Sequence, residues 1–173
     1  MAEKVKMDEV YARLLSADDR VVLDALATVQ AQGDARAIRP MLHALAGAPD
    51  RNVEQRIVSM LNEIKVPEAV PVLVEALAEP ALRSVRRTIL AAFWSAGLDV
   101  RDHLELLIAC AIEGNAAECL ECHTVIANQE FWPERTARNA MKLASEAAEA
   151  EADTYKASLL RDIGEEMAVR LGA

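Results

Sequence analysis

The chain has 173 residues, with 28 acidic and 19 basic side chains, and therefore carries a formal net charge of -9. This acidic balance disfavours nucleic acid as the main ligand, because a phosphate backbone needs a basic surface. Aromatic residues make up 3% of the chain and glycines number six, which favours helices over sandwiches or barrels in a single domain spanning residues 1–173.

Residues 1–17 are expected to form a short helix that caps the N-terminal end of the fold, with Val10, Leu14 and Leu15 turned inward. The first residues carry charges where a secretory signal would need an apolar stretch. No apolar run reaches the roughly 18 residues of a membrane span. The three cysteines indicate free thiols in a reducing compartment, so we expect a cytoplasmic protein with no membrane association.

From residue 18 onward, a pattern of helices repeats about every 32 residues. The segment that begins at Val21 aligns with segments that begin at Val53, Val85 and Glu118. Two columns of mostly apolar residues lie four positions apart, which marks one buried face of a helix. The columns are Ala25, Ile57, Ile89 and Cys122, and Val29, Leu61, Phe93 and Ile126.

A second amphipathic helix follows each of the first three. Its apolar positions are Ile38, Met41, Leu42 and Leu45, then Val70, Leu73, Val74 and Leu77, then His103, Leu106, Leu107 and Cys110. The third copy thus has a histidine in its first apolar position. Glycines follow the periodic stretches, where we expect left-handed C-cap residues: Gly33, Gly47, Gly97 and Gly114.

Paired helices in units of about 32 residues predict an all-α superhelix of stacked repeats. The expected repeats are 18–47, 50–79, 81–113 and 115–150. Two longer helices are expected from Pro133 to about Glu149 and from Ala152 to about Leu171, with 152–171 as the C-terminal cap. Phe131-Trp132-Pro133 is expected to close the core where the repeats stop.

The segment 52–77, with Asn-Val-Glu-Gln-Arg, Met-Leu and Val-Pro-Glu-Ala-Val-Pro-Val-Leu-Val-Glu-Ala-Leu, resembles a HEAT repeat of the phycobilisome-lyase-like subtype. Looser copies cover 18–47 and 81–113, where Val85-Arg86-Arg87 matches a Val-Arg-Arg element of the family. The resemblance extends over about residues 18–128. It implies a right-handed α-α superhelix, but such repeats serve as scaffolds, adaptors, lyases and glycosylases, so it does not select a function.

Charge divides the chain unequally. Residues 1–98 hold 13 acidic and 12 basic side chains, whereas residues 99–173 hold 15 and 7. The acidic C-terminal half either steers a basic partner or only keeps the surface solvated, and both interpretations stay open.

The motif Cys119-Leu-Glu-Cys122-His123 has the spacing of a c-type haem attachment box. With Cys110, the same residues are also candidate zinc ligands. However, Cys122 falls in an interior column, where a small apolar side chain simply packs. We expect no cofactor and no metal, and keep a metal- or haem-binding module as the alternative function.

Enzymatic activity is not expected. The histidines His43, His103 and His123 lie in no nucleophile motif, and the chain has no glycine-rich phosphate loop. The resemblance adds one further alternative, a chromophore-lyase-like accessory protein.

The leading hypothesis is a non-enzymatic scaffold, expected to be a monomer, that binds an unidentified protein on a concave surface lined by the second helices. The expected contacts are Arg36, Arg39, His43, Glu68, Glu75, Arg101 and Glu105. These charges run from basic to acidic along the surface, although simple solvation explains them equally well. Trp94 shares an otherwise polar column with Gln30 and Asn62, and is either an interface anchor or covered by the turn that follows it.

Overall fold

The computed structural model describes residues 6–172, which form ten α-helices and three short 3-10 helices with no strand. The all-α fold class is therefore confirmed. The chain divides into two compact units, unit 1 (Met1–Ala96) and unit 2 (Gly97–Ala173).

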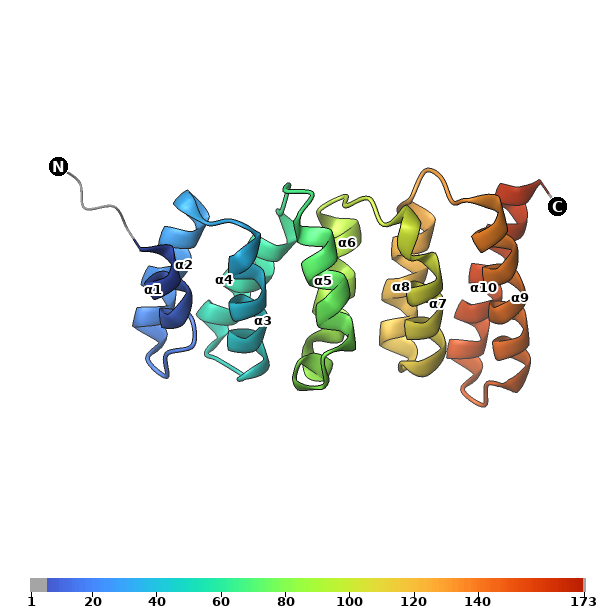
Figure 1. Cartoon of the computed structure of the whole chain (residues 1–173). Coiled ribbons are helices and arrows are strands. Elements are labelled where there is room, and N and C mark those ends of the chain that lie inside the picture. The colour runs from blue at the N-terminus through green and yellow to red at the C-terminus, as the bar shows by residue number, and fades with distance from the viewer. Residues whose placement is uncertain (1–5, 173) are drawn as a thin grey trace. The chain divides into compact units, whose positions relative to one another are not determined.

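Unit 1 consists of antiparallel helices in two layers. Its elements are α1 (Met7–Arg13), α2 (Asp19–Gln32), η1 (Ala35–Ala37), α3 (Ile38–Ala46), α4 (Arg51–Asn62), α5 (Ala69–Ala78), η2 (Pro80–Val85) and α6 (Arg86–Ser95). Helices α2, α4 and α6 pack side by side as one layer. In the other layer, α1 packs on α2, α3 packs on α4 and α5, and α5 packs on α6 (Figure 1).

The predicted interior columns of the first helices are buried. Ile57 and Leu61 on α4, and Ile89 on α6, have no exposed surface, and Phe93 is 1% exposed. Residues at i and i+4 lie on one helix face, so each helix presents the same two positions to the opposite layer. The column assignment is thus confirmed in unit 1, and the unit 2 members of the columns, Cys122 and Ile126, are also fully buried.

Unit 2 contains two helical hairpins. Its elements are η3 (Arg101–His103), α7 (Leu104–Glu113), α8 (Ala116–Asn128), α9 (Glu134–Ala150) and α10 (Thr154–Leu171). Helix α7 packs against α8 and α9, and α10 packs against α8 and α9. The two long C-terminal helices therefore form as predicted.

Small residues line the seam between α9 and α10. The α9 side presents buried alanines: Ala137, Ala140, Ala144 and Ala148. On α10, a Cβ added at Gly164 would lie 3.2 Å from the Ser145 hydroxyl oxygen, which shows how closely the two backbones approach. Alanine buries little apolar area, so the larger buried side chains of this hairpin come from α10: Leu159, Leu160, Ile163 and Met167.

Two basic side chains of α10 reach back to the preceding helices. The Lys156 ammonium, on a side chain that is 10% exposed, lies 2.8 Å from a Glu151 carboxylate oxygen and donates to the Ile112 carbonyl at 2.7 Å. Arg170 donates to the carbonyls of Gln129 and Ala127, the latter at 2.9 Å. These contacts tie both ends of α10 to the rest of unit 2.

Leu15 was expected in the core, but it is 59% exposed. Helix α1 ends at Arg13, and the turn that follows leaves Leu15 at the surface. Val10 and Leu14 are buried as predicted.

The second helix of the third repeat is displaced by one residue from its predicted register. His103 is half-buried at the end of η3, and Leu104, 1% exposed, takes the first apolar position. Leu104 follows η3 directly, as Ile38 follows η1, so these two positions are equivalent. The connection after α6 is therefore one residue longer than the predicted alignment assumed, and Leu106 is only half-buried.

Of the four glycines expected as left-handed caps, only Gly97 has a positive φ, of 65°. The expectation is wrong for Gly33, Gly47 and Gly114, whose φ values are negative. At Gly33, a Cβ would lie 2.5 Å from the Val29 carbonyl oxygen, so a close backbone approach, not handedness, favours glycine there.

None of the helices that the structure describes combines the length and the apolar content needed to cross a lipid bilayer.

The interior columns can be tested by truncation. We expect Ile57→Ala to lower the free energy of unfolding by about 2–5 kcal/mol, because it leaves a cavity at a fully buried site. Urea denaturation followed by far-UV circular dichroism measures this change. Val66→Ala, at a position 42% exposed, is the matched control and should change stability by less than about 0.5 kcal/mol. Equal effects of the two substitutions would contradict the column assignment.

The Lys156 contact can be tested in the same way. We expect Lys156→Met to destabilise the protein by about 1–3 kcal/mol, because it leaves the Ile112 carbonyl without its donor and Glu151 without its ion pair. The control is Lys142→Met, whose side chain is 73% exposed and whose ion pair spans 3.8 Å. That substitution should be neutral within about 0.5 kcal/mol. If Lys156→Met is equally neutral, Lys156 does not fasten α10.

Candidate functional site

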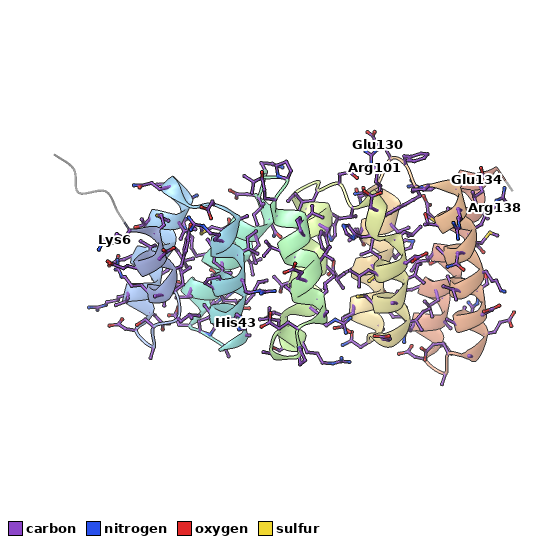
Figure 2. All side chains as sticks on the ribbon, viewed as in Figure 1. Lys6, His43, Arg101, Glu130, Glu134 and Arg138 are labelled. Carbon is purple, nitrogen blue, oxygen red and sulfur yellow. The ribbon has the colours of Figure 1, made fainter. Side chains whose placement is uncertain are left out.

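The α3–α5 charged face consists of Arg39, His43, Glu75 and Glu79. A guanidinium nitrogen of Arg39 lies 3.4 Å from Glu75, and another lies 3.5 Å from Glu79. The Nε2 atom of His43 lies 2.9 Å from the other oxygen of Glu79. All four side chains are part-exposed, from 27% at Glu79 to 68% at Glu75. Figure 2 labels His43 at the place where α3 meets α5.

Helical spacing explains why these four side chains meet. Arg39 and His43 are four residues apart on α3, and Glu79, the C-cap residue of α5, follows Glu75 by four residues. Residues at i and i+4 lie on one face of a helix, so a basic ridge on α3 runs beside an acidic ridge on α5. Exposed ion pairs contribute only about 0–1 kcal/mol each, so the network sets the charge pattern of the surface more than the stability of the fold.

Arg36 belongs to a separate cluster with α1. It forms a 2.8 Å ion pair with Asp34 and a 3.4 Å ion pair with Asp8, and its guanidinium lies 5.5 Å from the centre of the Tyr11 ring. The Arg36 hydrogen bonds lower the pKa of Asp34 to about 2. The Tyr11 hydroxyl donates to the same carboxylate at 3.1 Å. This arrangement fixes the start of α3 against α1.

The structure does not bring Trp94 together with the α3–α5 charged face. Trp94 is on α6, in the layer of α2, α4 and α6, and is 38% exposed. In its predicted column, Gln30 is exposed and Asn62 is half-buried. Glu68 precedes α5 as an exposed N-cap residue whose side chain makes no capping bond. The predicted contacts of unit 1 therefore lie on both layers.

In unit 2, the predicted contacts lie at the start of α7. Arg101 is in η3 and forms an ion pair of 2.6 Å with Asp99. Hydrogen bonds from Arg101 lower the pKa of Asp99. Glu105 lies on the exposed side of α7.

The three cysteines are core residues. Cys110, Cys119 and Cys122 are at most 2% exposed. Burial raises the pKa of the Cys119 thiol to about 11, which opposes the thiolate form that binds metals or forms thioethers. Across residues 6–172, no three His, Cys, Asp or Glu side chains are grouped so that they could hold a metal ion. The geometry therefore gives no support to the haem or zinc alternative.

Two residues of the candidate surfaces were missed in the sequence. Glu79 completes the α3–α5 charged face, and its position four residues after Glu75 was the available signal. Phe131 was grouped with Trp132 as part of the core. Trp132 is indeed buried, at 5% exposed, but Phe131 is 59% exposed.

Antiparallel helix pairs with recurring interior columns define a helical-repeat protein. A family model described as HEAT repeats matches residues 7–94, about half of the chain, and the chain belongs to this family. The match includes α1, which was expected only as an N-terminal cap, and it does not specify the phycobilisome-lyase-like subtype. Neither the comparison with curated proteins nor that with solved structures gives a match.

The thiol chemistry of Cys119 gives a test of its burial. Its pKa rises from 9.0 to about 11 on folding, so the unfolded chain releases this proton first as the pH rises. The contribution of the protonated Cys119 thiol to the free energy of unfolding is fully present below pH 9 and is lost as the pH rises towards about 11. We expect Cys119→Ala to flatten the fall in stability across this window, measured by urea denaturation at each pH.

The same protein gives a direct readout with a thiol reagent such as DTNB. We expect the Cys119 thiol to react slowly in the native protein at mildly alkaline pH and rapidly in guanidinium chloride. Comparison with the Cys119→Ala variant shows how much of the reaction with DTNB comes from Cys119. Rapid native reaction of this thiol would contradict the buried, protonated state.

Proposed function

We propose that the chain is a non-enzymatic protein-interaction scaffold whose partner binds the α3–α5 charged face. Members of the HEAT repeat family are commonly protein-interaction scaffolds. The observation that carries the proposal is the pair of ion pairs from Arg39 to Glu75 and Glu79, together with the 2.9 Å contact between His43 and Glu79. Each side chain is held by a neighbour and is still exposed, so the charges are ordered before a partner arrives.

The basic ridge on α3 and the acidic ridge on α5 determine which charge pattern a partner surface must have. A complementary surface presents acidic groups towards Arg39 and basic groups towards Glu75, and the reverse orientation meets like charges. Such a pattern selects orientation and raises the association rate more than it raises affinity. The partner is therefore a folded protein or a helix with carboxylates on one edge and ammonium or guanidinium groups on the other.

The remaining predicted contacts extend this proposal. In unit 1, Arg36 and Glu68 flank the α3–α5 charged face along the chain, and Trp94 is a proposed second anchor on the other layer. In unit 2, Arg101 and Glu105 are the proposed contacts. We also propose that the protein acts as a cytoplasmic monomer.

Charge reversal tests this surface. We expect Arg39→Glu to reduce recovery of the partner in affinity purification at least about tenfold, or about 1.4 kcal/mol. The matched control is Arg51→Glu, which reverses an exposed charge at the first residue of α4. This control should leave recovery unchanged, since a carboxylate is favourable in the first turn of a helix.

A double substitution separates recognition from local structure. Arg39→Glu with Glu79→Arg restores an opposite-charge pair between α3 and α5 but reverses its pattern. If the partner reads the pattern, the double variant stays defective. If Arg39→Glu acts only by disturbing the face, the double variant recovers binding, and the proposal is wrong. Loss of binding with Trp94→Ala alone would instead assign the partner to the layer of α2, α4 and α6.

A further inference from the structure

The anchor loop, residues 129–134, connects α8 to α9 and displays an exposed aromatic ring. Phe131 is 59% exposed, while its neighbour Trp132 is 5% exposed. Beside the ring is an open cavity of about 440 Å³. Its lining residues are Glu130, Phe131, Trp132, Glu134, Arg170 and Leu171. An exposed phenylalanine ring lacks the stabilisation that burial would give it. Its neighbour Trp132 gains that stabilisation in the core.

Hydrogen bonds hold the anchor loop from both sides. The Trp132 indole donates to the Ile126 carbonyl at 3.2 Å. The Gln129 side-chain amide donates to the Leu98 carbonyl at 2.9 Å and accepts from the Val100 amide at 3.2 Å. The guanidinium of Arg170 donates to the Gln129 carbonyl from α10. The ring of Phe131 is therefore presented by an ordered backbone, which lowers the entropy cost of binding at this position.

The side chains that line the cavity carry a net negative charge, because Glu130 and Glu134 outnumber Arg170. Three arginines near the cavity already have a carboxylate partner: Arg170 with Glu166 at 2.6 Å, Arg138 with Glu134 at 2.7 Å and Arg101 with Asp99 at 2.6 Å. A fourth, Arg135, is exposed but does not line the cavity. Glu130 makes no short ion pair within residues 6–172, but it lies near enough to Arg101 to act on that guanidinium electrostatically. Figure 2 shows Glu130 beside Arg101 and Glu134 beside Arg138.

Two further sources of negative potential act in the same direction. The cavity includes Leu171, the last residue of α10, and the C-terminal end of a helix carries a partial negative charge. Residues 99–173 hold 15 acidic and 7 basic side chains. An approaching cation is therefore attracted to unit 2 and meets the exposed ring beside Glu130.

We propose that the anchor loop binds an arginine or lysine side chain in a basic segment of a partner protein. The Phe131 ring supplies the face for a cation–π contact, and the Glu130 carboxylate supplies the opposite charge. The bound side chain lies in the cavity, with its alkyl stem against Phe131 and Leu171. This inference rests on the proposed scaffold function but uses a different surface from the α3–α5 charged face.

Other occupants fit less well. A second copy of this chain has a net charge of -9 and is repelled as a whole. A nucleic acid brings phosphates to a site that lacks an unpaired cation among the side chains that line the cavity, since Arg170 is held by Glu166. Charge complementarity thus selects a basic protein segment.

The test uses fluorescein-labelled octa-arginine as the probe, with labelled octa-glutamate as the charge control, in fluorescence anisotropy titrations of the full chain. We expect octa-arginine to bind and octa-glutamate not to bind. Phe131→Ala should weaken octa-arginine binding about fivefold, which matches the loss of one exposed cation–π contact of about 1 kcal/mol. Phe131→Trp should retain binding, because indole is the best cation–π acceptor.

The matched control is Tyr155→Ala, which removes another exposed aromatic ring of unit 2, at 56% exposed. It should leave octa-arginine binding unchanged, whereas Glu130→Gln should weaken it about threefold. Equal affinity of the Phe131→Ala and Tyr155→Ala variants would show diffuse attraction to an acidic surface and would overturn the proposal. No binding of octa-arginine by the unmodified protein would overturn it as well.

Sedimentation velocity supplies the remaining outcome. Self-association that disappears in Phe131→Ala would assign the anchor loop to a second copy and reject the basic segment. The peptide titration does not depend on Arg39. If Arg39→Glu has no effect on partner recovery while Phe131→Ala still weakens peptide binding, the α3–α5 charged face is wrong and the anchor loop stands.

Discussion

The constraint on which this structure depends is that no helix pair can bury its own apolar face. Ile57 and Leu61 have no exposed surface because α4 is covered by α3 and flanked by α2 and α6. Each helix therefore needs a neighbour in its own layer and one in the other layer, which is the physical basis of a repeat protein. Surfaces that face outward are then free of packing requirements, and their charges and aromatic rings are available for recognition.

The two units meet this constraint with different chemistry. Unit 1 fills its interior with leucine, isoleucine and phenylalanine, whose burial stabilises by about 1.5–3 kcal/mol for each large side chain. In unit 2, α9 is buried through alanines, and the large apolar side chains of the α9–α10 hairpin come from α10. Lys156 and Arg170 add hydrogen bonds from α10 to backbone carbonyls. Because these hydrogen bonds have direction, they also fix how α10 lies on α8, which apolar contacts alone specify less sharply.

The regular part of the fold was predictable because the sequence carries two periods, one within each helix and one between successive repeats. A helix repeats its face at i and i+4, and the chain repeats its units about every 32 residues, so the Ile57 and Ile89 column could be assigned without coordinates. The same reasoning placed Arg39 and His43 on one face. It did not predict their pairing with Glu79, which depends on how two helices pack. It also misplaced His103 by one residue, because the connection after α6 departs from the repeat.

Irregular segments limit such prediction further, and the anchor loop shows why. Phe131 and Trp132 are adjacent aromatic residues, and periodicity gives no rule for which one faces inward. The choice follows from hydrogen bonds that the sequence pattern does not contain: the Trp132 indole reaches the Ile126 carbonyl, and Arg170 holds Gln129 from far along the chain. The consequence distinguishes the two surfaces. Charges on the α3–α5 face already satisfy one another, so a partner must replace those contacts and gains mainly orientation. Glu130 makes no short ion pair within residues 6–172 and interacts with Arg101 only at longer range, so a cation that binds there breaks no short contact.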